Sequence, residues 1–449
     1  MRRRLVSLAV PMAALIATAG AAIGSTERLI SAPDLVRDRT GFEAPMVGTN
    51  VRAMGDTLLL PSGELSEDHA VRAALWNNRE VSAAFQEIGV AQAEYRQAVL
   101  PKNPTVEAEI RFGGTGRNPG ELAAMQDLTS ILFASMRKRA ARESVRSASL
   151  RAANAALLLV AEARSAFYAY QSAEQSRRLL ERAVQATQLQ ADVAQRQHEV
   201  GNITDLDLEN EQALYEQAKV ALSRGQFQVA EAAERLNRVM GLGTRAATWS
   251  VSADLAPPPA DGVPIAALDS VAVAQRLDLA AADAEIRAIE RSVSVARYEQ
   301  WPELRAGVHV EQEPEGTRTV GPAVEIAFPL FDRGQASVAK AHAQLRAAQD
   351  RRSALAVDVR SEARLAGERL ESARQLVEYY QTVVLPRRKR IAEQTRLQFN
   401  SMLVGLPQLV QANREELNAQ REFIEALRDY WTARAELERA VAGSLPRTG

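Results

Sequence analysis

Cysteine is absent from this chain of 449 residues, and histidine is scarce. The first absence excludes disulfide bonds, thiolate metal sites, a cysteine nucleophile and a lipid-bearing N-terminal cysteine. Histidine metal sites normally show clustered ligands, whereas the histidines here are scattered along the chain. They are His69, His198, His309 and His342. We therefore predict no bound metal ion and no cofactor.

Long apolar runs are missing after the N-terminus. Residues 1–19 have the pattern of a signal peptide that directs export, with basic residues at 2–4 and an apolar run at 5–16. Small residues at 17–19 form the predicted cleavage site. The alternative, a membrane anchor that is kept, is disfavoured because the apolar run is short. No later stretch of about eighteen apolar residues follows, so contact with a membrane must use strands or a surface.

An excess of one charge is missing too, because 55 Lys and Arg nearly balance 56 Asp and Glu. This balance gives no electrostatic case for a nucleic-acid partner. Catalytic motifs are also lacking: there is no phosphate-binding glycine loop, no H-E-x-x-H and no serine motif between a strand and a helix. The glycine-rich segment 113–116 follows alternating residues and precedes no helix, so it indicates a tight loop. We predict that the protein is not an enzyme.

The sequence after the signal peptide indicates an internal two-fold repeat. Glu87 aligns with Glu285 at an offset of 198, and Pro104 aligns with Pro302 at the same offset. Each half is predicted to contain a helix, two strands, a long helix and a returning helix. The predicted parts are an extended arm at 20–65, a first repeat at 66–240, a Pro-rich linker at 241–265, a second repeat at 266–443 and a tail at 444–449.

The predicted helices are unusually long. They span 67–99, 136–200 and 204–240 in the first half and 266–299, 333–402 and 406–442 in the second. A helix of some 64 residues runs about 95 Å, which no compact core accommodates. Along 204–240 apolar residues step by three and four, as in a coiled-coil seam, and Glu211 interrupts them. An ordinary elongated helical bundle would explain the same stripes.

The segments between these helices have the two-residue period of strands. In 105–112, Val106, Ala108, Ile110 and Phe112 alternate with charged residues, and 304–310 and 324–328 repeat the pattern. We predict that Leu128 to Phe133 supplies the remaining strand. Four such strands cannot close a wall alone, so copies of the chain must complete a membrane barrel. The alternative is a pair of soluble hairpins. The predicted pore-lining residues are Glu107, Glu109, Arg111, Arg305, His309 and Glu325.

Two local stretches strengthen a resemblance that covers essentially the whole chain after the signal peptide. They are Gly201-Asn202-Ile203-Thr204-Asp205-Leu206-Asp207-Leu208 and Phe399-Asn400-Ser401-Met402-Leu403-Val404-Gly405. With the duplicated order of elements, they resemble the TolC family of outer membrane factors, nearest to its cobalt-zinc-cadmium efflux branch.

The resemblance implies a homotrimer in the outer membrane of a Gram-negative bacterium, with a twelve-stranded barrel and a long periplasmic tunnel of helices. It implies a passive exit duct for heavy-metal cations, working with a periplasmic adaptor and an inner-membrane pump. Alternatives are a duct for drugs or secreted substrates, or a periplasmic coiled-coil adaptor. The implied tip and adaptor contacts are Gly201, Asn202, Thr204, Asp205, Asp207, Gly405, Gln408 and Gln411.

One feature departs from the family pattern. Gln408 and Gln411 stand where relatives place the aspartates of an acidic ring at the closed tip. Acidic residues gather in the first half instead, at Asp205, Asp207 and Glu209. Thr204 and Asp207 fit a helix capping box, and we favour this interpretation over a direct gating or cation-attracting role, although one residue can do both.

Overall fold

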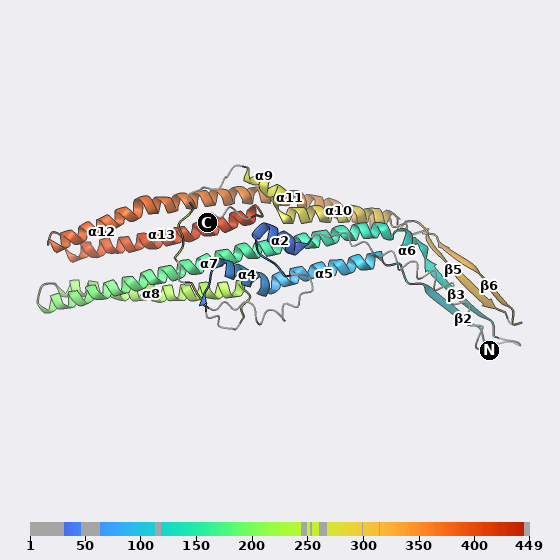
Figure 1. Cartoon of the computed structure of the whole chain (residues 1–449), viewed down its shortest axis with the longest axis horizontal. Helices are drawn as coiled ribbons and strands as arrows, with labels where there is room; N and C mark the ends of the chain where they lie inside the picture. The colour runs from blue at the N-terminus through green and yellow to red at the C-terminus, as the bar shows by residue number, and fades with distance from the viewer. Residues whose placement is uncertain are drawn as a thin grey trace. The chain divides into compact units, whose positions relative to one another are not determined.

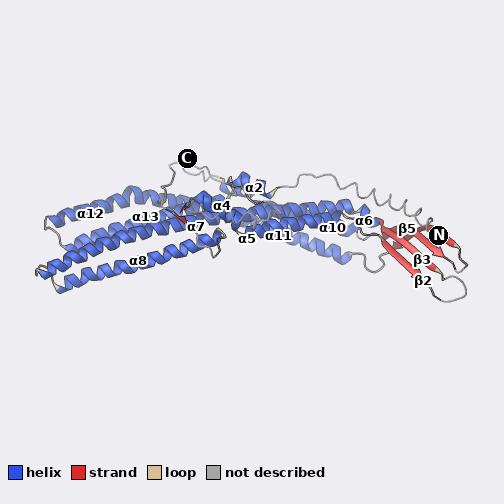
Figure 2. Cartoon of the chain, turned by 60° about the horizontal axis from the view of Figure 1, so that its bottom comes forward, coloured by secondary structure: helices blue, strands red, loops and turns tan. Residues whose placement is uncertain are grey.

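The computed structural model describes residues 31–45, 63–112, 118–243, 249–251, 254–259, 267–298, 300–313 and 315–443. The predicted signal peptide and the tail lie outside these residues. Within the unit Ala32–Gly449, helices run side by side, and the four strands of the larger sheet lie beyond one end of them (Figure 1, Figure 2). The prediction of a mainly helical chain with few strands is confirmed.

The first helix of each half is divided in two. In the first half α4 (Glu67–Asn77) and α5 (Arg79–Val99) meet at Asn78, whose side chain caps α5 by accepting from the amide of Glu80 at 2.9 Å. In the second half α9 (Leu268–Gln275) and α10 (Leu277–Tyr298) meet at Arg276. The two breaks are 198 residues apart (276 minus 78), the offset that aligns the halves in the sequence.

The long helices differ between the halves. In the first, α7 (Ala134–Glu199) is continuous and returns as α8 (Asp205–Val239). In the second, α11 (Gln335–Tyr379) passes through a π-helical turn, η1 (Tyr380–Val384), into α12 (Leu385–Asn400), which returns as α13 (Leu406–Ala440). Pro386 is the second residue after η1. Because proline lacks an amide donor and clashes with the carbonyl four residues earlier, the widened turn accommodates it.

The apolar stripe predicted along 204–240 lies against α7. Gly225 and Leu236 are buried there, and a Cβ atom at position 225 would lie 2.7 Å from Leu180 Cδ1. Small residues thus let the two helices approach closely. Ile424 and Leu427 are buried in the same way on α13. Burial of each such large side chain stabilises the fold by roughly 1.5–3 kcal/mol.

The larger sheet has the antiparallel order β2-β3-β5-β6, formed by β2 (Thr105–Ile110), β3 (Gly120–Asp127), β5 (Glu303–Gln312) and β6 (Arg318–Ala327). The prediction of a strand at Leu128 to Phe133 is wrong, since Leu128–Leu132 forms helix α6. The Asp127 carboxylate caps this helix by accepting from the amide of Ser130 at 2.8 Å. β2 and β6 are left with unpaired edges within the described chain.

Two further elements differ from the predictions. The arm predicted as extended contains helix α2 (Ala32–Thr40), in which Asp34 in the first turn and Arg37 in the last suit the helix dipole and Val36 is buried. Strand β1 (Gly63–Glu64) pairs in parallel with β4 (Trp249–Ser250) from the linker. Among the described helices, none is long and apolar enough to cross a membrane.

Candidate functional site

The larger sheet sorts its side chains onto two faces. Partners across an antiparallel ladder lie on the same face, and Glu107 opposes Ala123, which opposes His309. Arg305 likewise opposes Glu325. Five predicted pore-lining residues therefore share one face, and Arg111 follows the end of β2 with the same parity. The face is defined by Glu107, Glu109, Glu121, Arg305, His309, Glu311 and Glu325, and we call it the charged face.

Ion pairs cross the charged face. Arg111 Nε lies 2.9 Å from Glu109 Oε1, and its terminal nitrogen lies 3.0 Å from Glu121 Oε1 on the neighbouring strand. Arg305 lies 3.6 Å from the carboxylate oxygens of both Glu303 and Glu325. All of these groups are partly or largely exposed, so each pair contributes little stability. They give the face a polar, water-compatible surface.

The opposite face is apolar and exposed. Val106 pairs with Ala124, which pairs with Val308, and Leu122 pairs with Val310. Val106 is 64% exposed. A row of exposed valine and isoleucine side chains on a sheet marks a surface that meets another apolar phase or protein. Its exposed members are Val106, Ile110, Leu122, Val308, Val320, Val324 and Ile326.

At the opposite end of the helices, the first turn joins α7 to α8 (Figure 1). Gly201 has φ +79°, a left-handed conformation that favours glycine. Thr204 and Asp207 form the predicted capping box: Thr204 Oγ1 accepts from the Asp207 amide at 3.2 Å, and the Thr204 amide donates to Asp207 Oδ2 at 3.1 Å. The Thr204 hydroxyl also donates to Asp207 Oδ2 at 2.7 Å, and this bond, together with the one from the Thr204 amide, holds the pKa of Asp207 below its ordinary value. Asn202 lies in the turn, and Asp205 lies 2.6 Å from His198 Nε2.

The second turn joins α12 to α13. Gly405 is the N-cap residue of α13, Pro407 occupies its first turn, and no side chain caps it. Met402 is 93% exposed and Leu403 75% exposed. Neither residue is among the predicted tip contacts. The sequence did contain a signal for them, because two large apolar residues are unusual inside a turn, where polar residues are the rule.

Residues of the two hairpins line a common cavity of about 430 Å³ behind the turns. Asp207 and Glu211 come from α8, and Gln411 and Arg414 from α13. Gln408, another predicted tip residue, does not line it. The remaining lining residues are Ile203, Asn210, Ala213, Leu214, Gln217, Leu406, Pro407 and Val410.

Glu211, the residue that interrupts the apolar seam, is 5% exposed. Its Oε2 atom is buried and has no hydrogen-bond partner among the residues that the structure describes. Burial raises the pKa of Glu211, and the negative charge of Asp207 one turn earlier raises it further. The sequence signalled this site as an acid at a seam position, without showing that it would stay unpaired.

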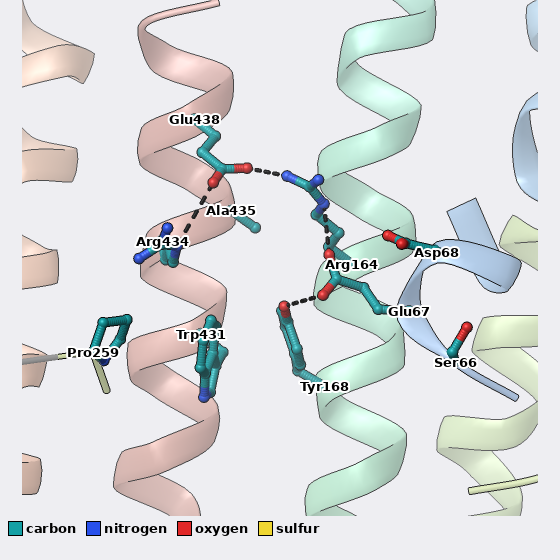
Figure 3. A pocket seen from close by; sticks show the side chains of 10 residues that line it. All are labelled: Ser66, Glu67, Asp68, Arg164, Tyr168, Pro259, Trp431, Arg434, Ala435 and Glu438. Carbon is teal, nitrogen blue, oxygen red and sulfur yellow. Dashed lines mark hydrogen bonds and ion pairs between the residues drawn. The ribbon is translucent and has the colours of Figure 1, made fainter. Parts of the chain in front are cut away.

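A second cavity, of about 330 Å³, lies at the level of α4 and carries a buried ionic network (Figure 3). Arg164 of α7 lies 2.8 Å from Glu67 Oε1 and also contacts Glu438 of α13. Tyr168 donates to Glu67 Oε2 at 2.8 Å, and its ring lies 5.4 Å from that of Trp431. Burial, reinforced by Glu67, raises the pKa of Tyr168. These ion pairs and the hydrogen bond from Tyr168 join α4, α7 and α13.

No group of three or more potential metal ligands occurs among the described residues. The candidate functional features of the described residues are the two-faced sheet and the two helix turns.

Comparison with known proteins gives a family match over part of the chain. The family model described as "Outer membrane efflux protein" matches residues 70–242. A search of curated proteins found no match.

Several solved structures are similar over most of their length. A membrane protein from Pseudomonas aeruginosa has 19% identity and a TM-score of 0.73, covering 84% of this chain and 92% of that one. CusC, studied for transmembrane channel formation, has 17% identity and a TM-score of 0.69, covering 90% and 99%. The Campylobacter jejuni CmeC outer membrane channel has 15% identity and a TM-score of 0.72, covering 92% and 91%. At these identities the similarity is one of fold.

Proposed function

We propose that this chain is an outer membrane efflux protein, the exit channel of a tripartite pump. The observation that carries the proposal is the larger sheet, which has one exposed apolar face, one charged face and, within the described chain, two unpaired edges. The family match and the channel fold support it, and both point away from an enzyme.

The open edges favour assembly with copies of the same chain. In lipid every backbone amide and carbonyl needs a partner, so an open sheet cannot enter a membrane alone. Three chains of four strands would give twelve, an even number within the range of bacterial barrels. β5 and β6 have ten residues each, within the roughly 9–11 that a tilted spanning strand needs.

In such a barrel the apolar face meets lipid and the charged face lines water. Glu107, Glu109, Arg111, Arg305, His309 and Glu325 are then the pore-lining residues. Both signs of charge are present and several are paired, so the wall is hydrated without holding an ion tightly. This is the character of a duct, in which the driving energy comes from an inner-membrane partner.

The helix turns are the proposed contact with the periplasmic adaptor. Exposed apolar side chains at both turns supply the surface: Val200, Leu206, Met402 and Leu403. Gly201, Asn202, Thr204, Asp205, Asp207, Gly405, Gln408 and Gln411 would surround them. An apolar centre within a polar rim is the usual anatomy of a protein interface.

We assign heavy-metal cations as the exported substrate on the resemblance to the metal-efflux branch. A wide duct needs no substrate-specific site, so its lining carries little information on this point. Deletion of the gene should lower tolerance to cobalt, zinc or cadmium. Unchanged metal tolerance with increased sensitivity to dyes or antibiotics would replace metals by drugs as the substrate class.

The channel proposal competes with a periplasmic coiled-coil adaptor, and fractionation separates them. We expect the mature protein in the outer membrane, as a trimer in mild detergent that conducts ions in a planar bilayer. A soluble periplasmic monomer without conductance would contradict the channel and favour the adaptor.

A further inference from the structure

The strands of the larger sheet and the helices meet along one edge, which we call the junction. β2 and β5 begin there, and β3 and β6 end there. On the helical side, α7 starts after the short helix α6, and α11 starts eight positions after the end of β6 (335 minus 327). Aromatic side chains stand exposed at this level: Trp301 is 64% exposed and Phe331 is 94% exposed. Exposed aromatic rings next to an apolar strand face are typical of the boundary between lipid tails and headgroups.

Four cations follow on the helical side of the junction: Lys138 and Arg139 in α7, Arg333 just before α11, and Lys340 within it. We call them the basic collar. Arg139, Arg333 and Lys340 are exposed and Lys138 is half-buried. Neighbouring cations are engaged in ion pairs, as Lys102 is with Asp127 and Arg291 with Glu143. No collar residue has a carboxylate partner within the part of the chain that the structure describes.

Local helix energetics do not account for the collar. A helix N-terminus carries partial positive charge and is stabilised by acidic residues, yet neither α7 nor α11 has an acid in its first turn. Lys138 and Arg139 add positive charge to that end of α7. An external anion would relieve this repulsion at the start of α7. At the start of α11 the Asp332 carboxylate accepts from the amide of Gly334 at 2.9 Å.

The depth of the collar matches one layer of a bilayer. At about 1.5 Å per residue, Lys138 lies about 6 Å along α7 from Ala134, and Lys340 about 7.5 Å along α11 from Gln335. The polar layer on each side of the hydrocarbon is roughly 5–8 Å thick. With the aromatic side chains at its boundary, the collar falls where the phosphates of the inner leaflet would lie.

We propose that the basic collar binds the phosphodiester headgroups of anionic phospholipids in the periplasmic leaflet of the outer membrane. The inference rests on the proposed membrane channel and adds a lipid partner to it. Lys138, Arg139, Arg333 and Lys340 bind the headgroup, while Trp301 and Phe331 pack against the upper acyl chains. The contact fixes the depth of the barrel in the bilayer.

Native mass spectrometry of the detergent-solubilised trimer tests the proposal. The trimer is mixed with phosphatidylglycerol or phosphatidylcholine of the same chain length, and the retained lipid is counted. We expect preferential retention of phosphatidylglycerol. Near an anionic surface each cation strengthens binding about fivefold at low salt, so the variant K138Q/R139Q/R333Q/K340Q should lose at least about tenfold of the preference. Added salt should weaken the wild-type preference.

A matched control carries R387Q/K389Q. These two exposed cations lie near the far end of the same molecule, have no acidic partner among the described residues, and should leave the preference unchanged. Equal retention of the two lipids by the wild type, or an unchanged preference in the collar variant, would overturn the proposal. Displacement of the lipid by inorganic phosphate would also overturn it, because it would identify a phosphate site.

Conductance of the wild type in a pure phosphatidylcholine bilayer separates this proposal from the channel itself. A conducting trimer without lipid preference would leave the channel intact and remove the collar. Absence of both trimer and conductance would remove the channel proposal instead. Circular dichroism and trimer mass establish that the collar variant is folded before its lipid binding is compared.

Discussion

Glu211→Gln should stabilise the end of the molecule that carries the helix turns, and the gain should depend on pH. Oε2 of Glu211 is buried at a seam position of α8 and has no hydrogen-bond partner among the described residues. A buried polar group without a partner costs roughly 1–3 kcal/mol, and more when it is charged. The amide keeps the shape and removes the charge, so only the part of this cost that is due to the charge is regained. We therefore expect a gain of about 1 kcal/mol at pH 7.5, at the lower end of that range.

The sign of the pH dependence follows from the raised pKa. The ordinary pKa of the carboxyl is 4.5, and in the folded protein it is higher. Below 4.5 the carboxyl is protonated in both the folded and the unfolded state, so the wild type carries no charge penalty. As the pH rises from 4.5 through the folded-state pKa, ionisation increasingly favours the unfolded state. The difference in stability between wild type and E211Q should be small at pH 4 and larger at pH 7.5.

Hydrogen exchange of the α8 amides near Glu211 measures the effect locally. A gain of about 1 kcal/mol slows exchange through local opening about fivefold at pH 7.5. Glu209→Gln is the matched control, because Glu209 lies on the same helix but is exposed, and it should change nothing. The charged groups that line the cavity with Glu211 are Asp207 and Arg414. If E211Q speeds exchange at pH 7.5, Glu211 is ionised and paired with Arg414, and the reasoning fails.

Three further substitutions test other parts of the structure. Gly307→Val should prevent pairing of β3 with β5 and abolish trimers, because a Cβ atom at position 307 would lie 1.8 Å from Ala124 O. The control Gly321→Ala should assemble normally, because a Cβ atom there meets no atom within 4 Å. Arg164→Ala should cost about 3–5 kcal/mol because it removes the buried guanidinium that lies between the carboxylates of Glu67 and Glu438. Arg369→Ala, in an exposed pair, should cost less than about 1 kcal/mol, and denaturant unfolding that ranks the two variants equally would refute a buried network. The double variant Met402→Ser with Leu403→Ser should weaken adaptor binding about tenfold in surface plasmon resonance. The reason is that partial burial of two such side chains in the interface contributes at least about 1.4 kcal/mol. Unchanged affinity would exclude this turn from the interface.

Periodicity predicted much of the secondary structure because long helices and two-faced strands repeat their signal many times. The seam along α8 and the alternation in β2, β5 and β6 depend on residues close in sequence. Strand β3 at Gly120–Asp127 was missed because its sequence carries little of this local signal, and the strand was predicted at Leu128 to Phe133 instead. Gly120, Ala123 and Ala124 have weak strand propensity, and β3 is held by ladders to β2 and β5 on both sides.

Contacts between distant residues could not be predicted from the pattern. The pairing of β1 with β4 joins residues 63–64 to 249–250, and Arg164 reaches Glu67 and Glu438. The π-helical turn had a local signal in Pro386, but a proline in a helix is equally compatible with a kink or an end. The sequence indicated Glu211 as an acid that interrupts the apolar seam. Whether its carboxylate has a partner depends on the α13 residues that line the same cavity, and the pattern of α8 does not reveal them.

Closure of the sheet between copies of the chain is the central claim, and an engineered disulfide tests it directly. A cysteine is placed on β2 (Glu107→Cys) together with one on β6, in separate variants at Gly321, Ala323 or Glu325. The chain has no natural cysteine. Within one chain β3 and β5 lie between these edges, so they are about 14 Å apart, beyond the roughly 7 Å that a disulfide can bridge.

Oxidation of intact outer membranes should therefore give covalent trimers in at least one variant, and each single-cysteine control should stay a monomer on a denaturing gel. Monomers in every double variant, after complete reaction of both thiols with a small alkylating reagent has been shown, would contradict closure of the barrel by copies of this chain.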